Sequence, residues 1–122
     1  MLLKVAFTLF ETQDTPRARR FYEEVLGLTL GSHDPNGVWT EYDLPQGGCL
    51  ALFHHPDPNH TPRFGGASVA FEVEDLDALN TQLKGQGVPY KADMIHSPVC
   101  RMSVITDPDG NEIILHQLKN RR

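Results

Sequence analysis

The sequence predicts an α+β fold built from two consecutive βαβββ units, and three observations carry this prediction. Short segments of alternating or β-branched residues, typical of strands, fill most of the chain and are separated by turns rich in Pro, Gly and Asn. An Asp that suits a helix N-cap directly follows such a segment twice, at Asp14 and at Asp75. These two residues lie 61 positions apart, which is half of the 122-residue chain, so one order of elements occurs twice.

The first unit begins with an expected strand at residues 3–11, where alternate side chains suit two partly covered faces. A helix is expected to start at Asp14-Thr15-Pro16, with an Asp or Thr cap and Pro near its first position. Gly27 should end it in the left-handed conformation. Three strands follow at residues 28–33, 38–44 and 49–54. The apolar stripe of the helix consists of Ala18, Phe21, Tyr22, Val25 and Leu26.

The second unit repeats this order with a strand at residues 67–73 and a helix that Asp75 caps and Gly85 or Gly87 ends. Strands are expected at residues 89–95, 101–106 and 112–118. The last two should form a hairpin, because Asp107-Pro108-Asp109-Gly110 has the composition of a tight turn. We therefore expect one domain, with a first module at about 1–55, a connection at about 56–66 and a second module at about 67–118.

Composition excludes several classes of protein. The chain is 39% apolar and 22% charged, which is typical of globular domains, and its net charge of −5 argues against a nucleic-acid partner. No apolar run approaches the ~20 residues that span a bilayer, and the start lacks the features of a signal peptide, so we expect a cytoplasmic protein with no membrane partner. Cys49 and Cys100 lack metal-binding spacing and are expected to be reduced thiols.

Two motifs together point to a family: FYEEVLGL at residues 21–28 and DPDGN at residues 107–111. With them, nearly the whole chain resembles the vicinal oxygen chelate (VOC) superfamily, which includes glyoxalase I, methylmalonyl-CoA epimerase, extradiol dioxygenases, fosfomycin-resistance enzymes and bleomycin-binding (bleomycin resistance) proteins. The resemblance implies two modules curled around a shared cavity that binds a small molecule, often within a homodimer. Because function varies widely in this superfamily, it must be argued from the site.

The resemblance also implies where a divalent metal would be held. The four ligand positions on the first and last strands of the two modules correspond to Phe7, Ala51, Ser68 and Ile114. Only Ser68 has a side-chain oxygen, and one neutral hydroxyl does not hold a cation that prefers carboxylates and imidazoles. We therefore expect no metal cofactor, which argues against the metal-dependent activities of the superfamily.

Strand alternation predicts which side chains face the cavity. An apolar cavity with a few polar anchors can bind a small organic molecule without a metal, and acidic anchors favour cationic or amine-bearing ligands. The aromatic residues Trp39 and Tyr42 are an odd number of positions apart, so only one of them should face inward. The expected ligand-binding residues are Phe7, Leu9, Glu11, Trp39, Phe53, Ser68, Ile114 and His116.

The alternative is an enzyme with a rearranged metal site, or a metal-free one in which His116 acts with Glu112 or Glu72 as proton carrier. His116 is also compatible with a partly exposed strand histidine that has no functional role. The domain as a whole is compatible with a regulatory module that binds no ligand. A register slip of one residue would turn His54 or Gln117 inward instead. The remaining candidates are expected to be structural: a solvated loop containing His54, His55 and His60, and a small buried side chain at Cys100.

Overall fold

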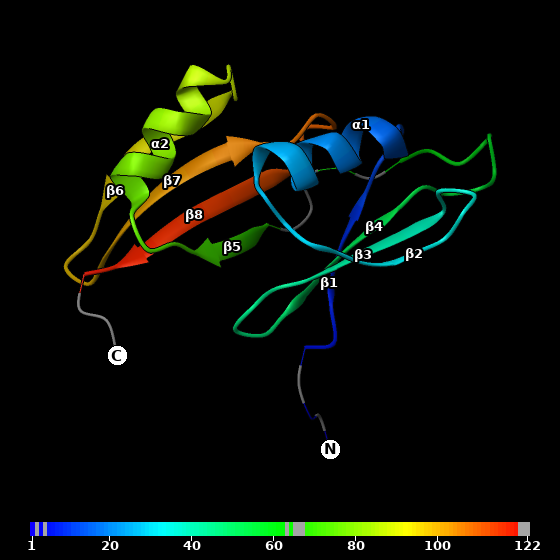
Figure 1. Cartoon of the computed structure of the whole chain (residues 1–122), viewed down its shortest axis with the longest axis horizontal. Helices are drawn as coiled ribbons and strands as arrows, with labels where there is room; N and C mark the ends of the chain where they lie inside the picture. Colours follow the sequence, from blue (N-terminus) through cyan, green and yellow to red (C-terminus); the bar gives the residue numbers. More distant parts are fainter. Residues whose placement is uncertain (2, 4, 63, 65–67, 120–122) are drawn as a thin grey trace. The chain divides into compact units, whose positions relative to one another are not determined.

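The computed structural model describes residues 1, 3, 5–62, 64 and 68–119 and contains two compact units, Met1–Phe64 and Gly65–Arg122 (Figure 1). Each unit has one four-stranded mixed sheet and one helical segment, which confirms the predicted pair of βαβββ units. Among the described residues, no helix has both the length and the apolar character needed to cross a membrane.

In the first unit the sheet order is β1-β4-β3-β2, with β1 parallel to β4 and the other neighbours antiparallel. The unit has six elements: β1 (Thr8–Glu11), the α-helix α1 (Thr15–Arg20), the π-helical turn η1 (Phe21–Val25), β2 (Leu30–His33), β3 (Trp39–Asp43) and β4 (Cys49–Phe53). A parallel β1 beside β4 places the first and last strands of the unit side by side.

The expected start of the first strand at residue 3 was wrong, because β1 begins at Thr8. Thr8 lies opposite Leu50, and β4 itself begins only one residue earlier, at Cys49. The residue before it, Gly48, has a φ of 94° in the turn between β3 and β4. The register would place residues 5 and 6 beyond the start of β4, where there is no strand residue to pair with, and Phe7 lies just outside the sheet.

The helical segment begins and ends as predicted, but its second half is a π-helical turn, which was not predicted. Asp14 caps α1, since its Oδ1 accepts a hydrogen bond of 3.1 Å from the backbone N–H of Arg17. The segment then widens into η1, where the N–H of Leu26 donates to the carbonyl of Phe21, 2.9 Å away. Gly27 follows with a φ of 75°, the left-handed conformation expected there.

The core of the first unit lies between this helical segment and one face of the sheet. Ala18 and Tyr22 are fully buried, as is Tyr42 on β3. The rings of Tyr22 and Tyr42 stack with centroids 5.8 Å apart. Three of the five residues of the predicted apolar stripe, Ala18, Phe21 and Tyr22, are thus buried, and the helical segment of this unit covers one face of its sheet.

The second unit repeats the arrangement, with sheet order β5-β8-β7-β6 and β5 parallel to β8. Its elements are β5 (Val69–Glu72), α2 (Leu76–Gly85), β6 (Tyr90–His96), β7 (Cys100–Thr106) and β8 (Glu112–Leu118). Leu76 and Leu83 of α2 are fully buried, and so are Ile105 and Ile113 on the face of the sheet that α2 covers. Cys100 is buried, as expected, and both cysteines are free thiols.

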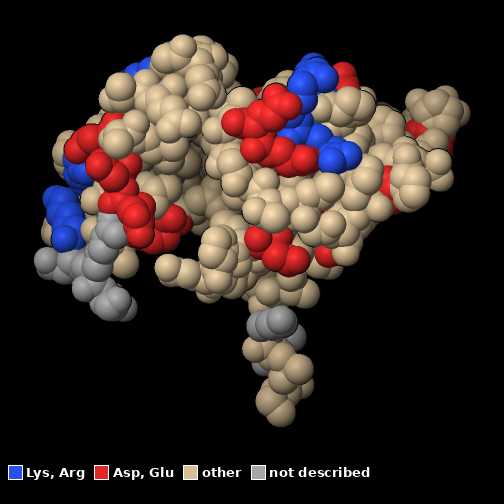
Figure 2. Space-filling view, in the orientation of Figure 1, with Lys and Arg blue, Asp and Glu red and all other residues tan. Residues whose placement is uncertain are grey.

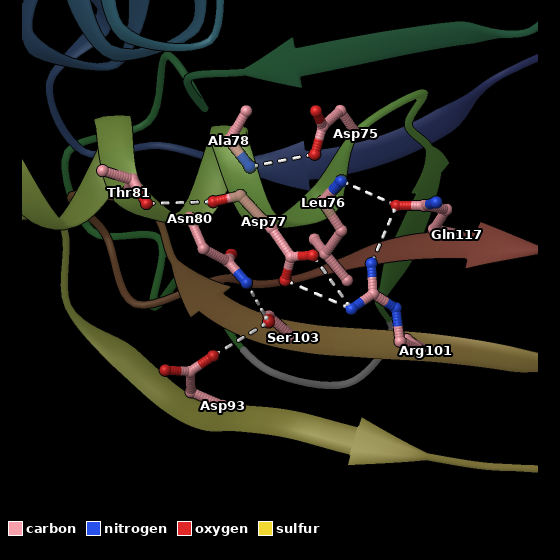
Figure 3. Close-up of polar contacts among 10 residues, drawn as sticks. All are labelled: Asp75, Leu76, Asp77, Ala78, Asn80, Thr81, Asp93, Arg101, Ser103 and Gln117. Carbon is pink, nitrogen blue, oxygen red and sulfur yellow. Dashed lines mark hydrogen bonds and ion pairs between the residues drawn. The ribbon is translucent and has the colours of Figure 1, made fainter.

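Polar side chains fix α2 onto its sheet (Figure 3). The amide nitrogen of buried Asn80 donates to the hydroxyl of Ser103 on β7 at 2.9 Å, and its oxygen accepts from the hydroxyl of Tyr90 at 2.7 Å. Burial, together with the charge of Asp93, raises the pKa of Tyr90 to about 12, so its hydroxyl stays a donor. Each buried polar group in this contact therefore has a partner.

The first turn of α2 is tied to β8 and β7. The backbone N–H of Leu76 donates to the side-chain oxygen of Gln117 at 2.7 Å, and Arg101 contacts both Gln117 and Asp77 (Figure 3). Gln117 therefore lies on the side of the sheet that α2 covers. The register slip that would have moved Gln117 to the other face is excluded.

Candidate functional site

Each sheet has one face opposite its helical segment, which is called its open face below. In the first unit, the strand register places Leu9 beside Ala51 and Glu41 in one row of this face. The next row contains Glu11, Phe53 and Trp39. Trp39 lies on the open face and Tyr42 on the helix side, in agreement with the predicted alternation.

An aromatic cluster covers much of this open face. The ring of Trp39 contacts those of Phe7 and Phe53, at centroid distances of 5.3 and 6.1 Å. Phe53 contacts His55 at 5.5 Å, and His55 stacks on His60 at 4.0 Å. Phe7 and the neighbouring Leu9 are 44% and 42% exposed, so the cluster has apolar surface within reach of a ligand.

Acidic side chains border the aromatic cluster. Glu11 Oε1 lies 2.6 Å from His60 Nε2, and the indole N–H of Trp39 donates to Glu41 Oε1 at 2.8 Å. Burial, then the charges of Glu41 and Asp43, raise the pKa of the Cys49 thiol above its usual range. Cys49 is therefore a poor nucleophile, and the chemistry of this face is that of aromatic rings and carboxylates.

The stretch that contains His54, His55 and His60 is a loop, as predicted, and residues 56–59 are exposed, but the three histidines are less solvated than expected. All three are half-buried, and His54 Nδ1 contacts the carbonyl oxygen of Thr12 at 3.0 Å. The loop turns back on itself where Asp57 accepts hydrogen bonds from the backbone of Asn59 and His60. A Pro-rich stretch without periodicity does not predict that the loop folds back towards the strands, although Asp57 and Asn59 are typical turn formers.

The open face of the second unit carries a carboxylate–imidazole pair. Glu72 and His116 are register partners on the parallel strands β5 and β8, and Glu72 Oε1 lies 2.5 Å from His116 Nδ1. The other carboxylate oxygen accepts a hydrogen bond of 2.9 Å from the backbone N–H of Leu118. With Nδ1 directed at the carboxylate, Nε2 of His116 is the ring nitrogen available as a base.

The other predicted residues of this unit lie elsewhere. Glu112 forms an ion pair of 2.9 Å with Lys91 and is four residues from His116 along β8, or about 13 Å. Ser68 is exposed and precedes the first residue of β5, while Ile114 is half-buried in a row with Ala70. Of the three candidate proton carriers, the structure pairs Glu72 with His116 and leaves Glu112 apart.

Comparison with known proteins assigns the family. The model of the Glyoxalase/Bleomycin resistance protein/Dioxygenase superfamily matches residues 4–115. The chain belongs to this superfamily. None of the curated proteins searched is similar enough to count as a match.

Solved structures of the superfamily share the fold. A glyoxalase/dioxygenase from Nostoc punctiforme is 24% identical, with a TM-score of 0.77 over 96% of this chain and 92% of that one. A superfamily member from Sphaerobacter thermophilus is 23% identical, with a TM-score of 0.77 and coverage of 95% and 98%. A lactoylglutathione lyase from Agrobacterium tumefaciens is 20% identical, with a TM-score of 0.75 and coverage of 93% and 92%. At these identities the likeness concerns the fold.

The side chains at the four positions that the resemblance assigns to metal ligands are a poor donor set for a divalent cation. Phe7, Ala51 and Ile114 have no donor atom in their side chains, and Ser68 offers one hydroxyl. Among the described residues there is also no group of three or more His, Cys, Asp and Glu side chains placed to hold a metal ion.

Proposed function

We propose that this superfamily member binds a small organic molecule on the open face of its first unit, without a divalent metal. The observation that carries the proposal is the aromatic cluster of Phe7, Trp39, Phe53, His55 and His60 beside carboxylates. Ligand sites combine such apolar walls with a few polar groups. A face with exposed aromatic rings and no metal ligands at the superfamily positions suits binding better than metal chemistry.

The preferred ligand is a cation with an apolar body. A cation is attracted to the face of an indole or phenyl ring, by about 0.5–2 kcal/mol. Glu11 and Glu41 add negative charge at the border of the cluster, and the net charge of −5 acts in the same direction over longer distances. An anion of the same size would meet repulsion from these carboxylates.

Trp39 provides a direct test, because it is the single tryptophan of the chain and lies inside the cluster. Three probes share one phenyl ring and differ in charge: benzyltrimethylammonium, benzyl alcohol and benzoate. We expect benzyltrimethylammonium to change Trp39 fluorescence in a saturable way and to bind at least fivefold more tightly than the other two. Equal responses to all three, or none up to 5 mM, would reject the proposal.

Replacing Phe7 with Ala should weaken binding of the cation about 5- to 10-fold, because the edge-to-face partner of Trp39 is lost. Phe7 is 44% exposed and lies outside the strand, so the variant should fold normally. Phe64→Ala is the matched control, since Phe64 is 36% exposed and lies in the connection away from the strands. Its affinity should stay within twofold of the parent chain.

A second candidate function is metal-free acid–base catalysis by Glu72 and His116. The specific observation in its favour is that both oxygens of Glu72 are engaged, one by His116 Nδ1 and one by the N–H of Leu118. A carboxylate fixed in this way orients the imidazole and holds the proton of the neutral ring on Nδ1, which leaves Nε2 free to act as a general base. Both side chains remain partly exposed, so a substrate can reach the imidazole.

The tautomer of His116 tests this second function. Nitrogen-15 NMR of the imidazole at pH 8 should show Nδ1 protonated and Nε2 bare, and Glu72→Gln should remove this preference. Finding Nε2 protonated in the parent chain would exclude Nε2 as the base. For any turnover that is detected, His116→Ala should fold normally and abolish it, whereas Phe7→Ala should leave proton transfer intact.

The resemblance to the superfamily also leads us to expect a homodimer. Light scattering coupled to size exclusion measures this directly, and a mass of 13.7 kDa across the micromolar range would show a monomer instead.

A further inference from the structure

The first unit contains a cavity that shares no lining residue with the pair of Glu72 and His116 or with Phe7, Leu9, Trp39 and Phe53 of the open face. Its volume is about 630 Å³, which is in the range of small-molecule sites. Its walls come from α1, η1, β2 and the turn after β2, together with His54 directly after β4. Figure 2 shows basic and acidic side chains next to each other over this helical segment.

One wall of the cavity is held by a closed set of hydrogen bonds. Arg19 donates from Nε and Nη2 to the two oxygens of Glu23, at 2.8 and 3.3 Å, and its Nη1 lies 3.2 Å from His33 Nε2. Glu23 also accepts from the hydroxyl of buried Tyr42 at 2.9 Å, and His33 Nδ1 lies 3.5 Å from the hydroxyl of buried Thr40. These hydrogen bonds thus join the helical segment to β2 and β3 at this wall of the cavity.

The charges of this wall are satisfied internally. The Glu23 carboxylate raises the pKa of Arg19, and the Arg19 guanidinium holds the pKa of Glu23 below its usual range. Because a guanidinium only donates, His33 Nε2 is the acceptor in its contact with Arg19. A ligand that entered the cavity would meet a rigid wall whose ion pair is already formed.

The opposite wall is fixed as well. The hydroxyl of Thr15 donates to the carbonyl of Gly37 at 2.7 Å, which clamps the turn of Pro35, Asn36 and Gly37 to the start of α1. Gly37 has a φ of 74°, and a Cβ there would lie only 3.4 Å from Thr15. The cavity is therefore formed without its ligand, which lowers the entropy lost on binding.

Two further charged side chains of the lining have no such partner. Arg20 and Glu24 are exposed, and in the part of the chain that the structure describes neither takes part in a hydrogen bond or ion pair. One is a cation and the other an anion, and they lie four residues apart on the same helical segment. A ligand with a single charge would be attracted by one and repelled by the other.

We infer that this cavity binds a small zwitterion, a molecule with a carboxylate that Arg20 pairs and an ammonium group that Glu24 pairs. Free α-amino acids and dipeptides are the corresponding chemical class. Arg20 offers a planar donor fork that suits a carboxylate, and Glu24 offers acceptors that suit an ammonium group. Two prolines of the lining, Pro16 and Pro35, give apolar contact to the body of the ligand.

The test is a titration of the ¹⁵N-labelled full chain followed by amide chemical shifts. L-Phenylalanine, L-glutamine and alanyl-alanine are the zwitterionic probes. Hydrocinnamate and phenethylamine are matched to phenylalanine, since each keeps the ring and one of the two charges. At least one zwitterion should saturate below 10 mM and shift the amides of Arg20, His33 and Asn36.

Hydrocinnamate and phenethylamine should bind at least tenfold more weakly at these amides than phenylalanine does. Arg20→Gln and Glu24→Gln should each weaken the zwitterion about tenfold, because each removes one charge-assisted contact. The matched controls Lys119→Gln and Glu74→Gln neutralise exposed charges of the second unit and should change nothing.

Three outcomes would overturn the inference: no saturation by any zwitterion, equal binding of the singly charged probes, or shifts centred on the indole of Trp39. The last of these would place the ligand on the open face. Failure here leaves the cation-binding proposal untouched, because that proposal is read from Trp39 fluorescence with probes that lack a carboxylate–ammonium pair.

Discussion

The turn between β7 and β8 offers a sharp test of how the second unit is held together. Asp107 is 5% exposed, and its Oδ1 accepts hydrogen bonds from the backbone N–H groups of Asp109 and Asn111, at 3.0 and 2.8 Å. Its Oδ2 accepts from the side-chain amide of Asn111, at 2.9 Å. The DPDGN motif is therefore a self-contained turn that joins β7 to the strand that carries His116. We predict that Asp107→Ala strongly destabilises the second unit.

The magnitude follows from the two bonds to Asn111, which is 2% exposed. A hydrogen bond to a charged group contributes about 1.5–3 kcal/mol, and buried donors that lose their acceptor are not rehydrated. Asp109 is half-buried, so water can replace its bond in part. Removing the carboxylate should therefore lower the free energy of unfolding by about 3 kcal/mol, a large share of the roughly 5–15 kcal/mol of a typical domain.

Urea unfolding followed by circular dichroism measures this loss. With an m-value of about 2 kcal/mol/M, a loss of about 3 kcal/mol moves the midpoint down by about 1.5 M. Trp39 fluorescence, recorded in the same samples, reports on the first unit alone. Agreement of the two midpoints in every variant would show that the units unfold together, and a separate early transition in circular dichroism would show that the second unit unfolds first.

Asp107→Asn is the matched variant, because it keeps Oδ1 and its two backbone hydrogen bonds while replacing Oδ2. It loses one of the two bonds to Asn111, so it should lower the free energy of unfolding by about 1.5 kcal/mol, half of the loss expected for Asp107→Ala. The reasoning is refuted if Asp107→Ala stays within about 0.5 kcal/mol of the parent chain, or if Asn is as damaging as Ala.

Three further predictions concern the rest of the molecule. Because Arg19 lowers the pKa of Glu23, their contribution to stability is complete above the unfolded value near 4.5 and is lost as pH falls through the lower folded value. Thermal melts of Glu23→Gln below pH 4.5 should therefore depend less on pH than those of the parent chain. Asn80→Ala leaves the half-buried hydroxyl of Tyr90 without its acceptor and leaves the Ser103 hydroxyl with its bond to Asp93 alone, and calorimetry should show a loss of about 1–3 kcal/mol. Low micromolar Zn²⁺, Ni²⁺, Mn²⁺ or Fe²⁺ should leave the melting temperature unchanged, and a rise of several degrees would contradict the metal-free proposal.

Features that depend on local pattern were predictable from the sequence. Both helix caps lie where an Asp follows a strand, and alternation along strands separated Trp39 from Tyr42 and His116 from Gln117. The reason is physical: a helix covers one face of each sheet, so neighbouring residues on a strand meet different surroundings. Such faces can be assigned without knowing which strands pair.

Features that depend on contacts between distant residues were not predictable. The start of β1 is set by where β4 begins, some forty residues later. The cavity beside α1 has a wall held by the hydrogen bond of Thr15 to Gly37, and His60 joins the aromatic cluster where it contacts Glu11. None of these contacts has a periodic or compositional signature in its own stretch of sequence.

The two units also differ in how the glutamate at the end of the first strand is paired with an imidazole, and this difference bears on function. Glu11 and Glu72 are equivalent positions at the ends of β1 and β5, and each contacts an imidazole. In the second unit this imidazole is the register partner on β8, His116, whereas the register partner of Glu11 on β4 is Phe53. In the first unit the imidazole belongs instead to His60, which lies in the loop after β4.

A pair held by two strands keeps its geometry, whereas a pair closed by a loop can open. Proton transfer needs atoms held to within fractions of an ångström, so Glu72 and His116 are the pair suited to catalysis. Opening of the loop would expose Glu11 and the rings of His55 and Phe53 together, which suits admission of a cationic ligand. If binding and catalysis both occur in this chain, this difference assigns binding to the first unit and proton transfer to the second.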